Sequence, residues 1–355
     1  MSEGSDASGG DEDSMRERAA VSSAKLWLLV AADRLVVAVV IAAFVFASML
    51  AVDAVPGVDS VGFLRTGDPV ETLFQAFVGA IITGVTLVVT LNQLVLSQEL
   101  GAVGDQRERM EGALSFRRDA EEVLEPAVAP TEPSAFLRAL VEASADRADA
   151  LVAAVEDANA SAAFDDAVSE YASSVTENAN AVASDLEDAE FGTFDVLSAA
   201  LDYDYSRKIY AARRFRVEYA EECTDDVEAA FDDLERALGL FAPAREHFKT
   251  LYFQWELVNL SRTILYAAVP ALVTAASMIV FFESGASFVA GEALGVSTGV
   301  TLVAAASAVS VFPFALLVSY ILRIATVTKR TLAIGPFVLR ETNRSAEFEF
   351  EDAPE

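Results

Sequence analysis

The chain has 355 residues, 53% of them hydrophobic, and carries 55 acidic against 25 basic residues, for a net charge of −30 at pH 7. A positive mean hydropathy of +0.36 beside so many charges means that apolar and charged residues are segregated into blocks. The surplus of negative charge disfavours nucleic acid as a partner, because phosphate backbones bind basic surfaces.

The rare reactive residues exclude most catalytic and cofactor chemistry. A single cysteine, Cys223, rules out an intramolecular disulfide, and a single histidine, His247, leaves no transition-metal cluster. The sequence contains no H-E-x-x-H zinc motif and no G-x-x-x-x-G-K-[ST] phosphate loop. We therefore expect a protein that is not an enzyme and that binds neither a metal nor a cofactor.

Four segments lack any Lys, Arg, Asp or Glu, and each is long enough to cross a hydrocarbon core of about 30 Å. They are Leu35–Val52, Leu73–Leu96, Ile264–Phe282 and Leu294–Leu322. The expected fold class is an all-α integral membrane protein with four transmembrane helices and a helical-bundle domain inserted between spans 2 and 3. The expected parts are a disordered acidic tail (1–24), a transmembrane hairpin (25–97), a cytoplasmic helical domain (98–262), a second hairpin (263–322) and a C-terminal tail (323–355).

The basic residues predict the orientation of the spans. Only Arg65 lies in the two loops that join span 1 to span 2 and span 3 to span 4. Because short loops rich in Lys and Arg stay on the cytoplasmic side, we expect both termini and the inserted domain in the cytoplasm of a multi-pass cell-membrane protein. The lipid bilayer is then the first partner.

The inserted domain has two long helical patterns. We expect the helix of span 2 to bend at Gly101 and Gly104, and the proline-rich stretch 126–133 to form a linker before these patterns begin. Apolar residues at spacings of three, four and seven mark one helix face from Leu137 to Val155 and another from Phe164 to Leu186. An intramolecular bundle and an oligomeric coiled coil both fit such faces. We favour the bundle, because each pattern lasts only about three heptads.

One strongly basic run interrupts the acidic domain between Ser206 and Val217. Its cations are Arg207, Lys208, Arg213, Arg214 and Arg216. They could form a site for an anion or a lipid headgroup. Alternatively, they form ion pairs with the acidic helix faces of residues 145–190, which is the interpretation we favour because carboxylates are in surplus there.

A stripe of polar and small residues follows one face of span 2. At about 100° per residue, its members fall within an arc of about 80° that contains no other position of the span. We call it the span 2 stripe: Thr72, Gln75, Gly79, Thr83, Thr86, Thr90, Gln93 and Ser97. Hydroxyls and amides that face hydrocarbon lose water and gain nothing, so the stripe is expected to meet either protein or water, as a helix contact or as the lining of a pore.

Two stretches carry a resemblance to a known group of proteins. They are LNQLVLSQELGAVGDQRERMEGAL (91–114) and FAPAREHFKTLYFQWEL (241–257). In this acidic, lysine-poor setting they resemble an uncharacterised family of haloarchaeal membrane proteins, which implies a salt-filled cytoplasm but no activity. The order of two spans, a helical insert and two more spans is more distantly similar to bestrophin-type anion channels, a likeness of plan in which span 2 would line an oligomeric pore.

Two functions remain open from the sequence. The first is a homo-oligomeric ion channel or pore with the span 2 stripe lining the path. The alternative is a non-catalytic, membrane-anchored sensor or scaffold that acts through its helical domain, with the stripe serving as a packing surface. Accessibility of the stripe to water-soluble reagents would separate the two.

Overall fold

The computed structural model describes residues 32–66, 68–124, 128–187, 189, 192–283, 289, 291–293 and 296–330. The chain divides into two compact units, described separately below. The inserted domain comprises Ala102–Tyr252, and the span unit comprises the described residues of Ala24–Gly101 and Phe253–Thr328. The tail expected at 1–24 and residues 331–355 of the C-terminal tail lie outside the described residues.

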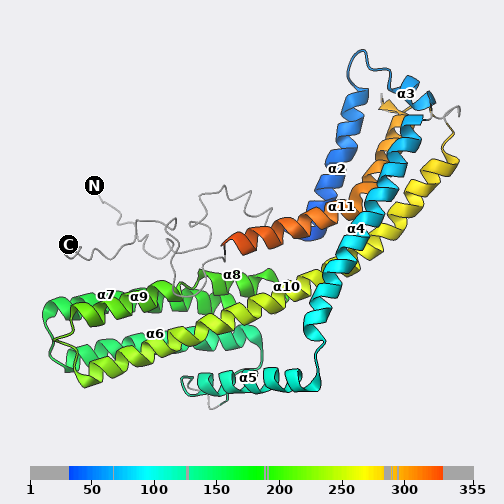
Figure 1. Ribbon diagram of the computed structural model, residues 1–355. Helices are drawn as coiled ribbons and strands as arrows, with labels where there is room; N and C mark the ends of the chain where they lie inside the picture. The colour runs from blue at the N-terminus through cyan, green and yellow to red at the C-terminus, as the bar shows by residue number, and fades with distance from the viewer. Residues whose placement is uncertain are drawn as a thin grey trace, which may run out of the picture. The chain divides into compact units, whose positions relative to one another are not determined.

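The inserted domain is built from helices. They are α5 (Val103–Glu121), α6 (Pro133–Asp157), α7 (Ala162–Glu187), α8 (Phe194–Asp202), α9 (Tyr205–Glu218) and the first part of α10 (Asp225–Phe281). Helices α6, α7, α9 and the first part of α10 run side by side around one hydrophobic core (Figure 1). The bundle interpretation therefore describes this domain, because both predicted apolar faces are buried within the chain.

Local signals explain where α6 and α7 begin. Pro133 occupies the first turn of α6, and the carboxylate of Glu132 caps the helix by accepting a hydrogen bond from the amide of Ala135 at 2.7 Å. At the start of α7, the hydroxyl of Ser161 accepts from the amide of Phe164 at 3.3 Å. Each cap satisfies an amide that has no partner inside its helix.

Aromatic side chains fill the centre of the inserted domain. Tyr203 and Phe241 pack edge to face with ring centroids 4.8 Å apart, and Tyr171 packs against Phe215 at 5.5 Å. The buried phenols are also hydrogen-bonded, Tyr171 as donor to the backbone carbonyl of Lys208 and Tyr203 with the hydroxyl of Ser144. Burial of each ring stabilises the fold by about 1.5–3 kcal/mol. The hydrogen bond of each phenol offsets the cost of removing its hydroxyl from water.

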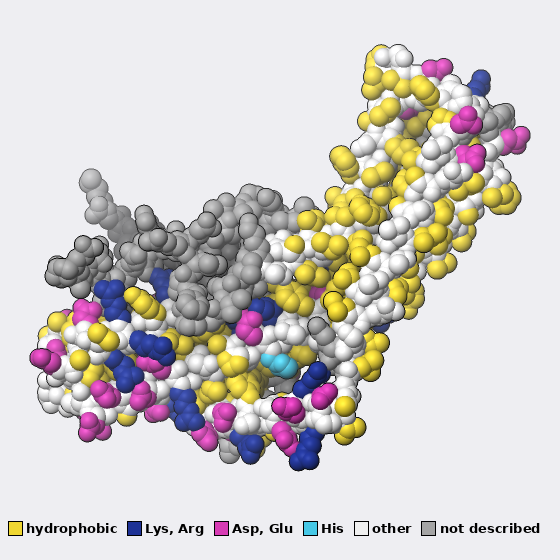
Figure 2. Space-filling view, in the orientation of Figure 1, with side chains coloured by type: hydrophobic (Ala, Val, Ile, Leu, Met, Phe, Trp, Pro, Cys, Tyr) yellow, Lys and Arg dark blue, Asp and Glu magenta, His cyan; other side chains and the backbone are white. Residues whose placement is uncertain are grey.

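Among the described residues, four helices are long and apolar enough to cross a membrane, and they form the span unit: α2 (Arg34–Asp53), α4 (Asp68–Glu99), the second part of α10, and α11 (Thr298–Arg330). They run side by side in Figure 1. Much of their outward surface is apolar (Figure 2). Phe44, Val269 and Val280 are among the large exposed hydrophobic residues, as expected for surfaces that meet lipid. The fold is thus helical throughout its long elements, as predicted.

Three details differ from the sequence expectations. Helix α10 begins at Asp225 and continues through Pro243 to Phe281, so the helix that contains span 3 starts far before the predicted Ile264. Span 4 begins as helix only at Thr298, because a short antiparallel pair, β1 (Glu292–Ala293) and β2 (Val296–Ser297), precedes it. A short helix, α3 (Ser60–Thr66), also lies in the loop between α2 and α4.

The break after span 2 lies where the glycines predicted it. Helix α4 ends at Glu99 and α5 begins at Val103, so Gly101 lies in the break and Gly104 lies inside α5. The break coincides with the boundary between the two units, which falls after Gly101.

Candidate functional site

The span 2 stripe lies on α4 with every one of its eight positions exposed on the chain. Figure 2 shows a white band along this helix, which is backbone and side chains that are neither charged nor hydrophobic, between yellow apolar side chains. Gly79 contributes no side chain, and a Cβ atom built there would meet nothing within 4 Å. The stripe is therefore not covered by the described residues of its own chain.

The packing face of α4 is the opposite one. Val70, Phe74, Ile81 and Val88 are buried and pack against residues of α10 and α11. At about 100° per residue, the mean direction of these four lies roughly 170° from the middle of the stripe. The helix therefore uses its apolar face to hold the span unit together and leaves its polar face outward.

Four hydroxyls of the stripe are hydrogen-bonded to the helix that carries them. Thr83 donates to the carbonyl of Gly79 at 2.8 Å, and Thr90 donates to that of Thr86 at 2.9 Å. Thr86 and Ser97 donate in the same way to carbonyls one turn earlier, those of Ile82 and Leu94. This corrects the premise that the hydroxyls lose a partner in hydrocarbon, because back-bonding of this kind satisfies the donor locally.

The two amides place a stronger constraint on what the stripe can face. Gln75 donates to the carboxylate of Glu71 at 2.9 Å, near the first turn of α4, whereas Gln93 lies exposed in the last third of the helix. An amide has two donors and an acceptor, which its own helix cannot fully satisfy. Gln93 and Gln75 are thus stronger evidence than the threonines that the stripe faces water or protein.

A buried ion pair lies in the span unit, and sequence reasoning missed it. Arg323 of α11 donates to Glu256 of α10 at 3.0 Å, with both side chains almost fully buried. Glu256 belongs to the predicted cytoplasmic domain (98–262) and Arg323 to the predicted C-terminal tail (323–355), so both were expected in water. The ion pair joins α10 to α11. Removing either partner would leave the other charge buried and unpaired, which is strongly destabilising.

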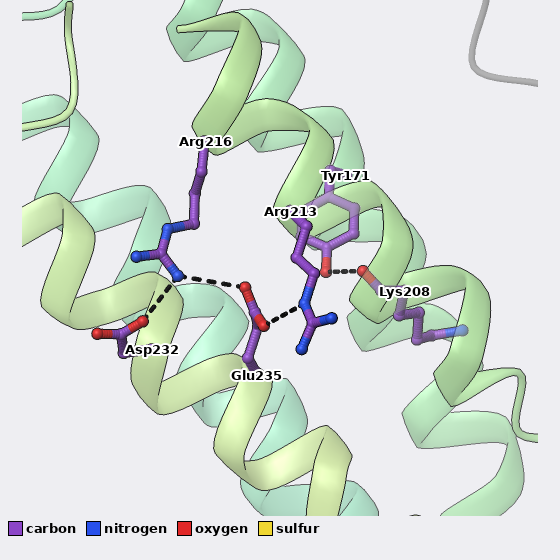
Figure 3. A network of polar contacts seen from close by, with 6 residues as sticks. All are labelled: Tyr171, Lys208, Arg213, Arg216, Asp232 and Glu235. Atoms are coloured by element: carbon purple, nitrogen blue, oxygen red, sulfur yellow. Dashed lines mark hydrogen bonds and ion pairs between the residues drawn. The ribbon is translucent and has the colours of Figure 1, made fainter. Parts of the chain in front are cut away.

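The basic run forms most of α9, and two of its arginines form ion pairs with α10 (Figure 3). Arg213 lies 2.8 Å from Glu235, and Arg216 lies 2.7 Å from Asp232 and 3.3 Å from Glu235. Burial opposes the charge of Arg216, but the two carboxylates outweigh it and raise its pKa. The partners of Arg213 and Arg216 are thus on α10, which corrects the expectation of residues 145–190.

The other cations of the run are held differently. Lys208 is buried, donates to the side-chain oxygen of Asn178 at 2.7 Å and lies 5.0 Å from the centre of the Tyr203 ring. Arg214 pairs with Glu218 at 3.9 Å, and the backbone amide of Arg207 donates to Asp204 at the start of α9. The run therefore serves the packing of α9, and its charges are not gathered into one open anion site.

The candidate reactive residues lie in the inserted domain. Cys223 is half-buried, and its pKa is raised by burial and by nearby Glu228, which lowers the fraction of reactive thiolate. His247 packs against Phe248 with ring centroids 5.7 Å apart. Among the described residues, no three His, Cys, Asp or Glu are placed together to hold a metal ion.

Sequence reasoning also missed one match to a nucleophile motif, GVSTG at residues 295–299. Its serine, Ser297, is buried, donates to the carbonyl of Val289 at 3.2 Å and accepts from the amide of Val300 at 3.4 Å. A nucleophile needs an exposed hydroxyl beside a base. Ser297 instead caps the start of α11.

A family model described as "Family of unknown function (DUF7972)" matches residues 1–352, so the chain belongs to that family. No curated protein and no solved structure matches the chain. Membership therefore supplies no activity, and function has to be argued from the geometry of the span 2 stripe.

Proposed function

We propose that this member of a family of unknown function is a homo-oligomeric membrane channel or pore in which α4 of each subunit lines the path. One observation carries the proposal: all eight positions of the span 2 stripe are exposed, on the face of α4 opposite the one that packs within the chain. A polar face that its own chain leaves uncovered is available to water or to a second copy.

The chemistry of the stripe favours an aqueous path over a simple helix contact. Close helix contacts use small residues, but Gln75 and Gln93 project long amides from the same face. Amide and hydroxyl dipoles can replace part of an ion's hydration shell without a fixed charge. The likeness of plan to bestrophin-type channels points to the same helix, although it rests on no matched residue.

The proposal includes an orientation. With 24 of the 25 basic residues outside the two loops that join the paired spans (25 − 1, Arg65), both termini and the inserted domain are assigned to the cytoplasm. The acidic, lysine-poor composition fits a cytoplasm of concentrated salt, such as that of a halophilic archaeon, where screening weakens the repulsion among carboxylates.

Cysteine accessibility tests the aqueous path. In a Cys223→Ser background, Thr83, Thr86 and Thr90 are replaced one at a time by cysteine in the full chain, reconstituted in vesicles. A membrane-impermeant thiol reagent is expected to modify all three, because they face water. Leu87→Cys is the matched control on the same helix, exposed but outside the stripe, and is expected to remain unmodified in lipid.

The same experiment separates the channel from a sensor or scaffold. If the three stripe cysteines resist the reagent as completely as the cysteine at 87, the channel proposal fails. A membrane-anchored sensor or scaffold, with the stripe as a protein contact, would then be the function to pursue.

A further inference from the structure

A cavity of about 230 Å³ lies within the span unit, between α4, α10 and α11. It is lined by Ile81 and Gly84 of α4, Ile264 of α10, and Phe314 and Leu317 of α11. It is therefore on the side of α4 that packs within the chain, away from the span 2 stripe. Protein interiors are normally close-packed, and an engineered apolar cavity of about 150 Å³ is already large enough to take up benzene.

Two residues explain why the helices leave this space. Gly84 has no side chain, and a Cβ atom built there would meet nothing within 4 Å. Pro313 lies inside α11 and lines the cavity, and its ring leaves the carbonyl one turn earlier without an amide donor. The cavity thus results from a glycine on α4 and a proline inside α11.

The lining limits what can occupy the cavity. Its side chains are apolar except for the hydroxyl of Ser310, which is 1% exposed and has no hydrogen-bond partner among the described residues. A buried water needs two to four polar partners, and one hydroxyl does not supply them. With no charged group in the lining, an ion or a polar metabolite would lose its hydration without compensation.

The cavity reaches the outer surface of the span unit. Phe314 is 55% exposed and Ala80 is also exposed, and both belong to the lining. Leu87 and Ile321 lie about two turns farther along the same helix faces as Ala80 and Phe314, and both are exposed and apolar, as expected for a surface that meets hydrocarbon. The molecules that surround such an opening in a bilayer are lipids.

We propose that this cavity binds the alkyl chain of a membrane lipid. The chain enters beside Phe314 and Ala80 and fills the space at Gly84, so that α4 packs against α10 and α11 partly through lipid. Ser310 needs no polar ligand, because a helical serine can turn its hydroxyl to a carbonyl of the preceding turn. The proposal does not depend on whether the span 2 stripe faces water.

Photo-crosslinking tests the proposal directly. The full chain is reconstituted in phosphatidylcholine vesicles that contain a phosphatidylcholine with a diazirine on one acyl chain, and crosslinked peptides are mapped by mass spectrometry after illumination. Crosslinks are expected to concentrate at residues 77–85 and 310–317, relative to the lipid-facing residues Val269 and Val273 as the internal reference. Gly84→Leu is expected to lower this excess at least fivefold, because its side chain fills the cavity.

Gly79→Leu is the matched control. It makes the same substitution on the same helix at another glycine with open space, but on the stripe, and is expected to leave cavity crosslinking within twofold of the unmodified chain. If Gly84→Leu does not fold, Ala80→Leu at the mouth of the cavity is expected to give the same loss.

Three results would overturn the proposal. The first is crosslinking at the cavity no stronger than at Val269 and Val273. The second is an excess that survives both filling substitutions. The third is its loss in Ser310→Ala, which is expected to stay within twofold, because dependence on the hydroxyl would mean a polar occupant.

Discussion

Tyr203 and Tyr171 are buried phenols in the centre of the inserted domain, and burial raises the pKa of both. An acid with a raised pKa in the folded chain stays protonated there, while the unfolded chain loses the proton near pH 10. Stability from these groups is therefore fully present below about pH 10 and falls as the pH rises above it, by about 1 kcal/mol per tyrosine between pH 10 and 11.

This dependence can be measured as the unfolding midpoint of the full chain in detergent from pH 8 to 11. Tyr203→Phe is expected to flatten the decline above pH 10, because it removes one of the two titrating groups. Tyr210→Phe is the matched control, since Tyr210 is 58% exposed, and its profile is expected to follow the unmodified chain. An unchanged slope in Tyr203→Phe would show that its titration does not limit stability.

The span 2 stripe also shows which features of single residues can be predicted from the sequence. The positions of the span 2 stripe followed from helical periodicity alone. Periodicity could not predict what the stripe contacts, because it shows only that the two faces of a helix differ in polarity. The hydrogen bonds of the Thr83 and Thr90 hydroxyls could not be predicted either, because the sequence does not specify a side-chain rotamer.

Helix α9 is joined to α10 by charge, and the two carboxylates involved are not equivalent. The side chain of Glu235 is 15% exposed and accepts from Arg213 and Arg216, whereas that of Asp232 is 66% exposed. Glu235→Gln is expected to lower the free energy of unfolding by about 1–2 kcal/mol, because two arginines lose a partly buried partner. Asp232→Asn is expected to cost less than about 0.5 kcal/mol.

Both variants can be compared by denaturant unfolding of the full chain, followed by circular dichroism at low salt. Equal losses from the two would contradict the assignment of Glu235 as the main link between α9 and α10.

At the level of elements, prediction succeeded where patterns were long and failed where they were short. Helices α6 and α7 followed from apolar spacing over about three heptads. The pair β1 and β2 could not be found, because two residues per strand are too few to show an alternating pattern. Pro243 lies inside α10, where its cost of about 3 kcal/mol is offset by burial of neighbours such as Phe241 and Ala244.

For the whole molecule, the exposed stripe predicts self-association. The mass of the detergent-solubilised protein, measured by light scattering with the detergent subtracted, is expected to be a multiple of 37.8 kDa. Gly79→Leu, which places a bulky side chain on the stripe, is expected to shift the protein toward the monomer, whereas Gly84→Leu on the opposite side is not. A monomeric unmodified chain would contradict a pore with one lining helix per subunit.

The back-bonded threonines of α4 have a consequence for the sign of any solute they meet. Thr83, Thr86 and Thr90 each direct their hydroxyl hydrogen into their own helix. Each oxygen keeps lone pairs for a second partner, so the threonines present acceptors and no donors to their surroundings. Such a row of oxygens resembles the carbonyl linings that coordinate cations, and it leaves the amides of Gln75 and Gln93 as side-chain donors of this face.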